Sequence, residues 1–296
     1  MISFFKKILK DFSDDGCSVR AAALAYYTIF AMPPLLILLL LIAGAVWDPA
    51  EVQHRIEVEF STLAGAEAAA AIRDMIAHAQ RPAAGGVGTT VIGVGALMFG
   101  ALGAFMQLQS ALNRAWEVRP DPKQGGWRPF VMKRLLSLGM ILALAFLLIV
   151  SLAVSAILSA LSATLTFIPV EALQAFDMLA SFLVMTVLFA AIFKILPDAE
   201  IRWGDVWVGA LVTSSLFVMG KFVIGFWLGR TGPGDAYGTA SALAVMLVWV
   251  YYAGMIVLFG AEFTQAWAER RGVQIIPEKG AIRVEQREVV SSAPRA

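Results

Sequence analysis

Six long apolar stretches constrain what this chain can fold into. Each has about 20 residues or more, the length that a helix needs to cross the hydrocarbon core of a bilayer. Backbone groups cannot stay unpaired in hydrocarbon, so continuous apolar runs of this length form helices. The predicted spans are residues 24–46, 86–108, 135–158, 176–196, 206–228 and 239–261. The sequence therefore predicts an all-α, polytopic membrane protein with six transmembrane helices.

The composition excludes several classes of protein. Apolar and aromatic residues make up 59% of the chain and charged residues only 15%, whereas an ordinary soluble domain has about 25% charged residues. The mean hydropathy is +0.76. A single cysteine, Cys17, rules out an internal disulfide. These values exclude a soluble globular enzyme, a disordered regulator and a disulfide-rich secreted domain.

The distribution of basic residues predicts the orientation. With the six spans as given, 18 Lys and Arg residues fall on the side of both termini and five on the opposite side. Connections on the cytoplasmic side carry the excess of Lys and Arg. We therefore expect the N-terminus and the C-terminus to be cytoplasmic.

Three segments outside the spans have their own predicted character. Residues 3–12 form an amphipathic helix, which suits either the cytoplasmic headgroup layer or packing against the other helices. The external loop, residues 47–85, contains two predicted helices, 51–60 and 66–79, and thus a small helical cap that acts as a lid or as a plain connector. Residues 273–296 are predicted to be a flexible cytoplasmic tail.

The chain lacks the residues of common catalytic and binding sites. Its two histidines, His54 and His78, both lie in the external loop. No HxH, HExxH, CxxC, GxSxG or Walker A pattern is present. The sequence therefore predicts no catalytic residue, no metal site, no cofactor and no nucleic-acid partner, and we expect a protein that is not an enzyme.

Two features within the spans are candidates for a transport pathway. Lys221 is ionisable and lies inside the fifth predicted span, where it either faces a cavity or extends its amine to the interface. Pro33 and Pro34 remove two helix donors, so the first span is expected either to break close to the hydroxyl of Tyr26 or only to kink there.

Further polar residues complete the set of candidates. Gln107 and Asn113 give the second span a polar inner half. A glycine-rich external turn either gates the pathway or only connects two spans. Glu262, at the inner end of the sixth span, is expected to form an ion pair at the cytoplasmic rim. The turn contributes Arg230, Asp235 and Tyr237, and the expected partners of Glu262 are Arg20 and Arg114.

Three stretches carry a family resemblance. Residues 20–38 (RAAALAYYTIFAMPPLLIL), 111–117 (ALNRAWE) and 235–266 (with AYG and GAEF) resemble the YihY/BrkB family of bacterial inner-membrane proteins. The resemblance implies a six-span protein of the bacterial cytoplasmic membrane, linked to envelope integrity and lipid transport. It implies no catalytic or binding residues. The family was once labelled a tRNA-processing ribonuclease. This sequence contains no cluster of catalytic residues that would support that activity.

Three hypotheses about function follow. The first is a transporter or flippase-like facilitator of an amphipathic, lipid-like and anionic envelope molecule, not driven by ATP bound to this chain. The second is a non-transporting membrane scaffold that supports envelope integrity. The third, disfavoured by the missing catalytic residues, is a membrane-bound ribonuclease. The expected partners are membrane lipids and a lipid-like substrate, and the sequence does not indicate an oligomeric state.

Overall fold

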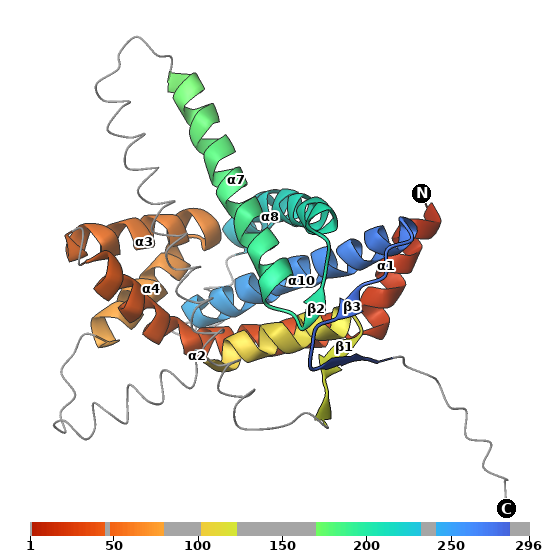
Figure 1. Cartoon of the computed structure of the whole chain (residues 1–296). Coiled ribbons are helices and arrows are strands. Elements are labelled where there is room, and N and C mark those ends of the chain that lie inside the picture. The colour runs from red at the N-terminus through yellow and green to blue at the C-terminus, as the bar shows by residue number, and fades with distance from the viewer. Residues whose placement is uncertain (1, 45–47, 80–101, 123–169, 232–240, 285–296) are drawn as a thin grey trace, which may run out of the picture.

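The computed structural model describes residues 2–44, 48–79, 102–122, 170–231 and 241–284, and most of them are helical (Figure 1). A helix also covers residues 102–115. The remaining helices are α1 (Ile2–Asp14), α2 (Cys17–Ala43), α3 (Pro49–Ala64), α4 (Ala66–Ala79), α7 (Val170–Ile195), α8 (Trp203–Thr231) and α10 (Ser241–Arg270). Short strands, which an all-α prediction omits, are β1 (Val118–Pro120), β2 (Ala199–Glu200), β3 (Ile276–Pro277) and β4 (Ala281–Arg283).

Three helices in the described part of the chain are long and apolar enough to cross a membrane. Their apolar segments are Met178–Ile195 in α7, Trp203–Ile224 in α8 and Leu243–Arg270 in α10. They overlap with the predicted fourth, fifth and sixth spans, residues 176–196, 206–228 and 239–261. The predicted first span begins within α2. The third predicted span and most of the second lie outside the described residues, so the count of six stays a prediction.

Of the two expectations for Pro33 and Pro34, the break is wrong, because α2 is one continuous helix from Cys17 to Ala43. Each proline still removes one backbone donor. The helix is held on both sides of the pair by packing: Ile29 before it and Leu36 and Leu40 after it are buried in the same apolar cluster as Val245 of α10. Helices α2 and α10 lie side by side (Figure 1).

Helices α8 and α10 approach each other closely at two glycines. A Cβ atom on Gly209 would overlap with the Oγ1 atom of Thr264, and one on Gly260 would overlap with that of Thr213. Each threonine hydroxyl donates to the carbonyl of the glycine on its own helix, at 2.7 Å. Small residues of this kind let membrane helices pack closely.

The two predicted helices of the 47–85 loop are confirmed as α3 and α4. Asp48 caps α3, since its Oδ1 accepts the backbone N–H of Ala50 at 2.8 Å, and Pro49 begins the helix. Ile56, Ile72 and Ile76 are buried in the apolar cluster that α2 and α10 share. Whether this cap acts as a lid or a connector stays open.

The N-terminal helix α1 packs against the end of α10. Phe4 contacts Phe263 and Phe12 contacts Phe259, with ring centroids 5.6 and 6.3 Å apart. Phe5 and Leu9 remain exposed on the same helix. The helix is therefore docked on the protein and still presents an apolar face that a membrane surface can cover.

The prediction of a flexible tail from residue 273 fails for residues 273–284. Strand β3 pairs antiparallel with β2, and Ala199 lies opposite Pro277. Strand β4 pairs antiparallel with β1, and Val118 lies opposite Arg283. These ladders fasten the segment to two distant connections of the chain, whereas residues 285–296 lie outside the described residues.

Candidate functional site

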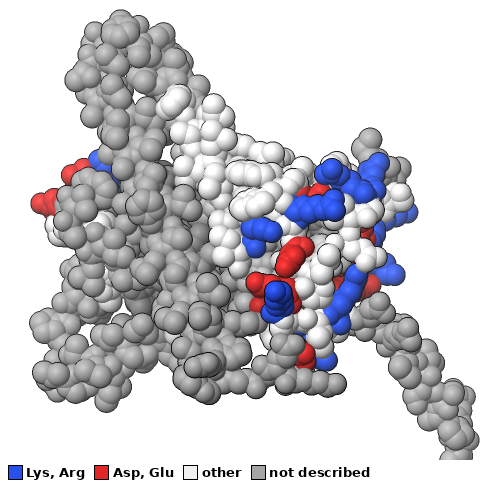
Figure 2. Space-filling view, viewed as in Figure 1, with Lys and Arg blue, Asp and Glu red and all other residues white. Residues whose placement is uncertain are grey.

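Charged side chains gather at one end of the described molecule. Figure 2 shows Lys, Arg, Asp and Glu side by side over α1, the end of α10 and the nearby strands, while the upper part of the described surface, over α7, is white. Large apolar side chains are exposed along α7 and α8, including Met178, Leu183, Met219 and Phe222. An apolar surface next to a charged end suits a protein that lies in a bilayer.

A cavity of about 950 Å³, here called the charged cleft, opens at this end. It lies between α1, the helix of residues 102–115, β1 and the end of α10. Both signs of charge occur in its lining. The basic members are Lys7, Lys10, Arg20, Arg114 and Arg119, and the acidic members are Asp11, Asp14, Asp15, Glu117, Asp198 and Glu269.

A pair of reciprocal hydrogen bonds fixes one wall of the charged cleft. Asn113 Nδ2 donates to Asp198 Oδ2, and the backbone N–H of Asp198 donates to Asn113 Oδ1, each at 2.8 Å. Both residues are buried. The bonds join the helix of residues 102–115 to the connection between α7 and β2, so two segments far apart in sequence form one rigid wall.

Ion pairs join the other elements around the charged cleft. Arg114 Nε lies 2.9 Å from Asp15 Oδ1, and Arg20 Nε donates to the backbone oxygen of Asp15 at 3.0 Å. Burial raises the pKa of the Asp15 carboxyl although the Arg114 charge opposes it. Lys7 pairs with Glu269. Burial alone would lower the pKa of Lys7, but the hydrogen bond and charge of Glu269 outweigh burial and raise it.

Glu262 does not form the predicted ion pair with Arg20 or Arg114. Its side chain is buried, and its Oε1 accepts a hydrogen bond from Cys17 Sγ at 3.4 Å. Arg114 and Arg20 contact Asp15 instead, because Asp15 lies just before the start of α2, within reach of both arginines. Burial also raises the pKa of the Cys17 thiol, which lies before the first predicted span, so this thiol is not a reactive nucleophile.

None of the other predicted site residues whose side chains are described lines the charged cleft. Tyr26 is exposed, and its ring lies 4.9 Å from that of Phe30. Pro33 and Gln107 are half-buried on their helices. Lys221 is half-buried on α8, does not line the charged cleft and has no ion-pair partner among the described residues. Pro34 and Arg230 lie on α2 and α8, and Asp235 and Tyr237 are outside the described residues.

The structure thus brings three predicted residues, Arg20, Asn113 and Arg114, into the charged cleft. The sequence did not single out Asp15 or Asp198. A signal for Asp198 was present, since it is an acid placed directly between two predicted spans. For Asp15 no such signal exists, because its partner Arg114 comes almost a hundred residues later.

Among the described residues, no group of three or more His, Cys, Asp and Glu side chains is arranged to hold a metal ion. Several polar groups of the charged cleft form hydrogen bonds and ion pairs with one another, among them Lys7 with Glu269 and Arg114 with Asp15. They form a surface that can bind a polar, charged group.

Long apolar helices with a charged cleft at one end define an integral membrane protein. The chain belongs to the family described as Virulence factor BrkB, whose family model matches residues 8–283. This confirms the resemblance to the YihY/BrkB family that the sequence motifs indicated.

Curated relatives are membrane proteins. A UPF0761 membrane protein of Alkalilimnicola ehrlichii is 30% identical over 275 residues, which cover 90% of this chain and 58% of that protein. A UPF0761 membrane protein of Alcanivorax borkumensis is 26% identical, with 89% and 60% covered. One of Vibrio parahaemolyticus is 28% identical, with 91% and 83% covered. The chain thus spans less than two thirds of the first two relatives, and no solved structure matches it.

Proposed function

We propose that this protein is a transporter or flippase-like facilitator that moves an amphipathic, lipid-like envelope molecule across the bacterial cytoplasmic membrane. In this proposal six helices cross the membrane and both termini are cytoplasmic. The observation that carries it is the charged cleft, a cavity of about 950 Å³ at one end of apolar helices. Ligand cavities in proteins are typically about 300–1,000 Å³.

The lining of the charged cleft supports a headgroup that carries both charges. Lysine and arginine side chains bind phosphate, and aspartate and glutamate side chains bind an amine. Both kinds line the cleft in similar number. A zwitterionic headgroup with a phosphate and an amine therefore fits better than the anionic headgroup that the sequence predicted. The acyl chains would remain in the lipid beside the exposed apolar faces of α7 and α8.

The test compares two pairs of substitutions in the full chain reconstituted in liposomes. Lys10→Gln with Arg119→Gln removes two exposed charges of the charged cleft. Lys6→Gln with Lys279→Gln removes two exposed charges elsewhere and is the matched control. Transbilayer movement of a fluorescent phosphatidylethanolamine is followed by chemical quenching of the outer leaflet.

We expect wild type and the control pair to move the labelled lipid and the cleft pair to move it about tenfold more slowly, since a hydrogen bond to a charged group contributes about 1.5–3 kcal/mol. Wild-type liposomes that move lipid no faster than empty ones would contradict transport and leave the scaffold hypothesis. Equal rates for the two pairs would remove the charged cleft from the pathway.

A further inference from the structure

A second cavity lies where two candidate spans meet one membrane face. The apolar segment of α7 ends at Ile195 and that of α8 begins at Trp203, so the short connection between them stays at a single face. Lys194, Arg202 and Trp203 lie in or beside this connection. Basic residues and tryptophan are enriched at this level, where lipid headgroups lie.

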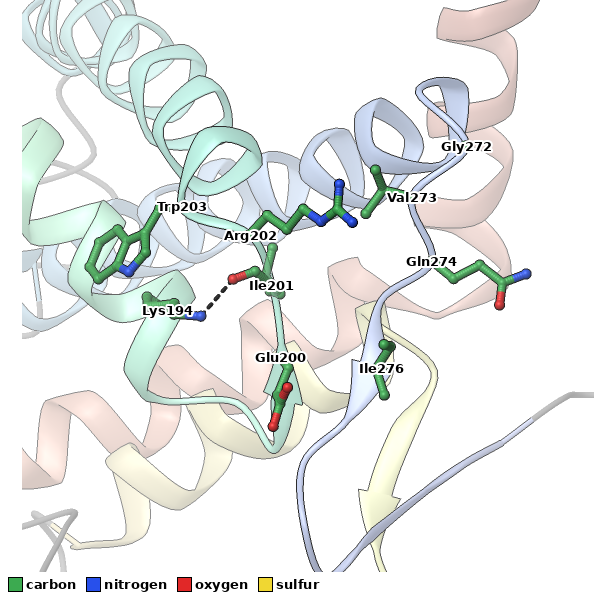
Figure 3. Close-up of a pocket in the computed structure, with 9 residues that line it drawn as sticks. All are labelled: Lys194, Glu200, Ile201, Arg202, Trp203, Gly272, Val273, Gln274 and Ile276. Carbon is green, nitrogen blue, oxygen red and sulfur yellow. Dashed lines mark hydrogen bonds between the residues drawn. The ribbon is translucent and has the colours of Figure 1, made fainter.

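The cavity has a volume of about 620 Å³ and is built from two distant parts of the chain. One wall is the connection from Lys194 to Trp203, and the other is the segment that follows α10, from Gly272 to Ile276 (Figure 3). The pairing of β2 with β3 holds the two walls together. The cavity is therefore a feature of the ordered C-terminal segment and does not overlap the charged cleft.

The ammonium group of Lys194 is held in position at this cavity. Its Nζ donates to the backbone oxygen of Ile201 at 2.6 Å and lies 5.8 Å from the centre of the Trp203 ring. A lysine ammonium has three donors. Only one of them is used in this contact, so the charge is fixed and two donors remain for a ligand.

Arg202 supplies a second positive charge at this cavity. Within the described part of the chain, Arg202 has no ion-pair partner. The nearest acid in its own helix turn, Asp205, is buried and binds Arg271 at 3.1 Å. Glu200 also lines the cavity, but its carboxylate points away from Arg202 in Figure 3.

Apolar groups flank these two charges. The side chains of Trp203 and Ile276 are 53% and 60% exposed, although both are large and apolar. A lipid presents a phosphate and apolar chains together. Acyl chains that cover Trp203 and Ile276 would therefore explain why both side chains are exposed next to a cationic cavity. A soluble anion would leave both side chains exposed to water.

We propose that this cavity binds the phosphate of an anionic phospholipid headgroup in the membrane leaflet at the Ile195–Trp203 level. Lys194 and Arg202 contact the phosphate, while Trp203 and Ile276 pack against the first part of the acyl chains. This lipid site is separate from the proposed transport pathway and holds whether or not the protein transports.

The test measures lipid binding to the purified full chain in detergent by native mass spectrometry. Phosphatidylglycerol, phosphatidylcholine and inorganic phosphate are titrated separately against wild type, Arg202→Gln and Lys279→Gln. The Lys279→Gln variant is the control, because it removes the same charge from an exposed residue that does not line the cavity. Arg202 is exposed, so its substitution leaves the folded core intact.

We expect wild type and Lys279→Gln to bind phosphatidylglycerol in preference to phosphatidylcholine, and Arg202→Gln to bind it about tenfold more weakly through loss of a charge-assisted contact. Equal binding by Arg202→Gln and Lys279→Gln would overturn the site. Inorganic phosphate that binds as tightly as phosphatidylglycerol would overturn the lipid assignment.

Discussion

At the scale of single residues, the amide of Asn113 holds one wall of the charged cleft in place. It donates one hydrogen bond to the Asp198 carboxylate and accepts another from the Asp198 backbone. Gln109, one turn earlier on the same helix face, lies at 3.5 Å from the same carboxylate. Because its hydrogen bonds are shorter, Asn113 contributes more to the stability of this wall than Gln109 does.

We therefore predict that Asn113→Ala destabilises the folded protein by about 3 kcal/mol, because it removes two buried hydrogen bonds, one of them to a charged group. Gln109→Ala serves as the control and is expected to cost less than about 1 kcal/mol, since its bond is long. Thermal unfolding of both variants in detergent measures the difference. Equal melting temperatures for the two variants would contradict the role of Asn113.

Single residues of the charged cleft also show how much of the site could be predicted from the sequence. Asn113, Arg114 and Arg20 were identified as polar residues near the inner ends of apolar segments, and they do line the charged cleft. The partner of Glu262 was not predictable. A carboxylate at the end of a span needs a partner, but whether that partner is an arginine or the Cys17 thiol depends on how α2 and α10 are rotated against each other.

At the scale of helices, the contact between α8 and α10 depends on the absence of side chains at Gly209 and Gly260. Each position receives the threonine of the opposite helix. Replacing a glycine inside a helix by alanine normally stabilises the helix by about 1 kcal/mol. At these two positions we expect the same replacement to destabilise the protein, because an added Cβ atom forces the helices apart.

We predict that Gly209→Ala destabilises the protein by about 1–3 kcal/mol through overpacking. Gly204→Ala on the same helix is the matched control, since a Cβ atom there meets nothing within 4 Å. Urea or thermal unfolding followed by circular dichroism compares the two variants. A Gly209 variant as stable as the Gly204 variant would show that the helices do not cross at this point.

Helices were predictable where local apolarity alone decides them. The spans in α7, α8 and α10 and the two helices of the cap follow from patterns that lie within each helix itself. The strands were not predictable, because each has only two or three residues and pairs with a segment far away in sequence. The continuity of α2 depends likewise on packing against α10, which the proline pair does not reveal.

At the scale of the whole molecule, the two ends of the described structure differ. The charged cleft and the ordered C-terminal segment lie at one end, and the cap of α3 and α4 lies toward the other (Figures 1 and 2). The excess of Lys and Arg belongs to the end that carries α1 and the C-terminal segment. The positive-inside rule therefore predicts that this end is cytoplasmic.

This orientation predicts the labelling of two cysteine variants by a membrane-impermeant maleimide in intact cells. His54→Cys on α3 should react at once, whereas Lys279→Cys should react only after the membrane is permeabilised. Both residues are exposed, and the native Cys17 is fully buried and gives little background. The wild-type chain is the control. The opposite pattern would invert the orientation.

The pairing of β1 with β4 has a consequence for biosynthesis. Glu117 and Arg283 are 166 positions apart and form an ion pair at 3.1 Å beside this ladder. The ribosome therefore completes every predicted span before β4 emerges to meet its partner. The predicted spans can therefore insert before β4 pairs with β1, and the part of the cleft lining that Val284 contributes is completed after them.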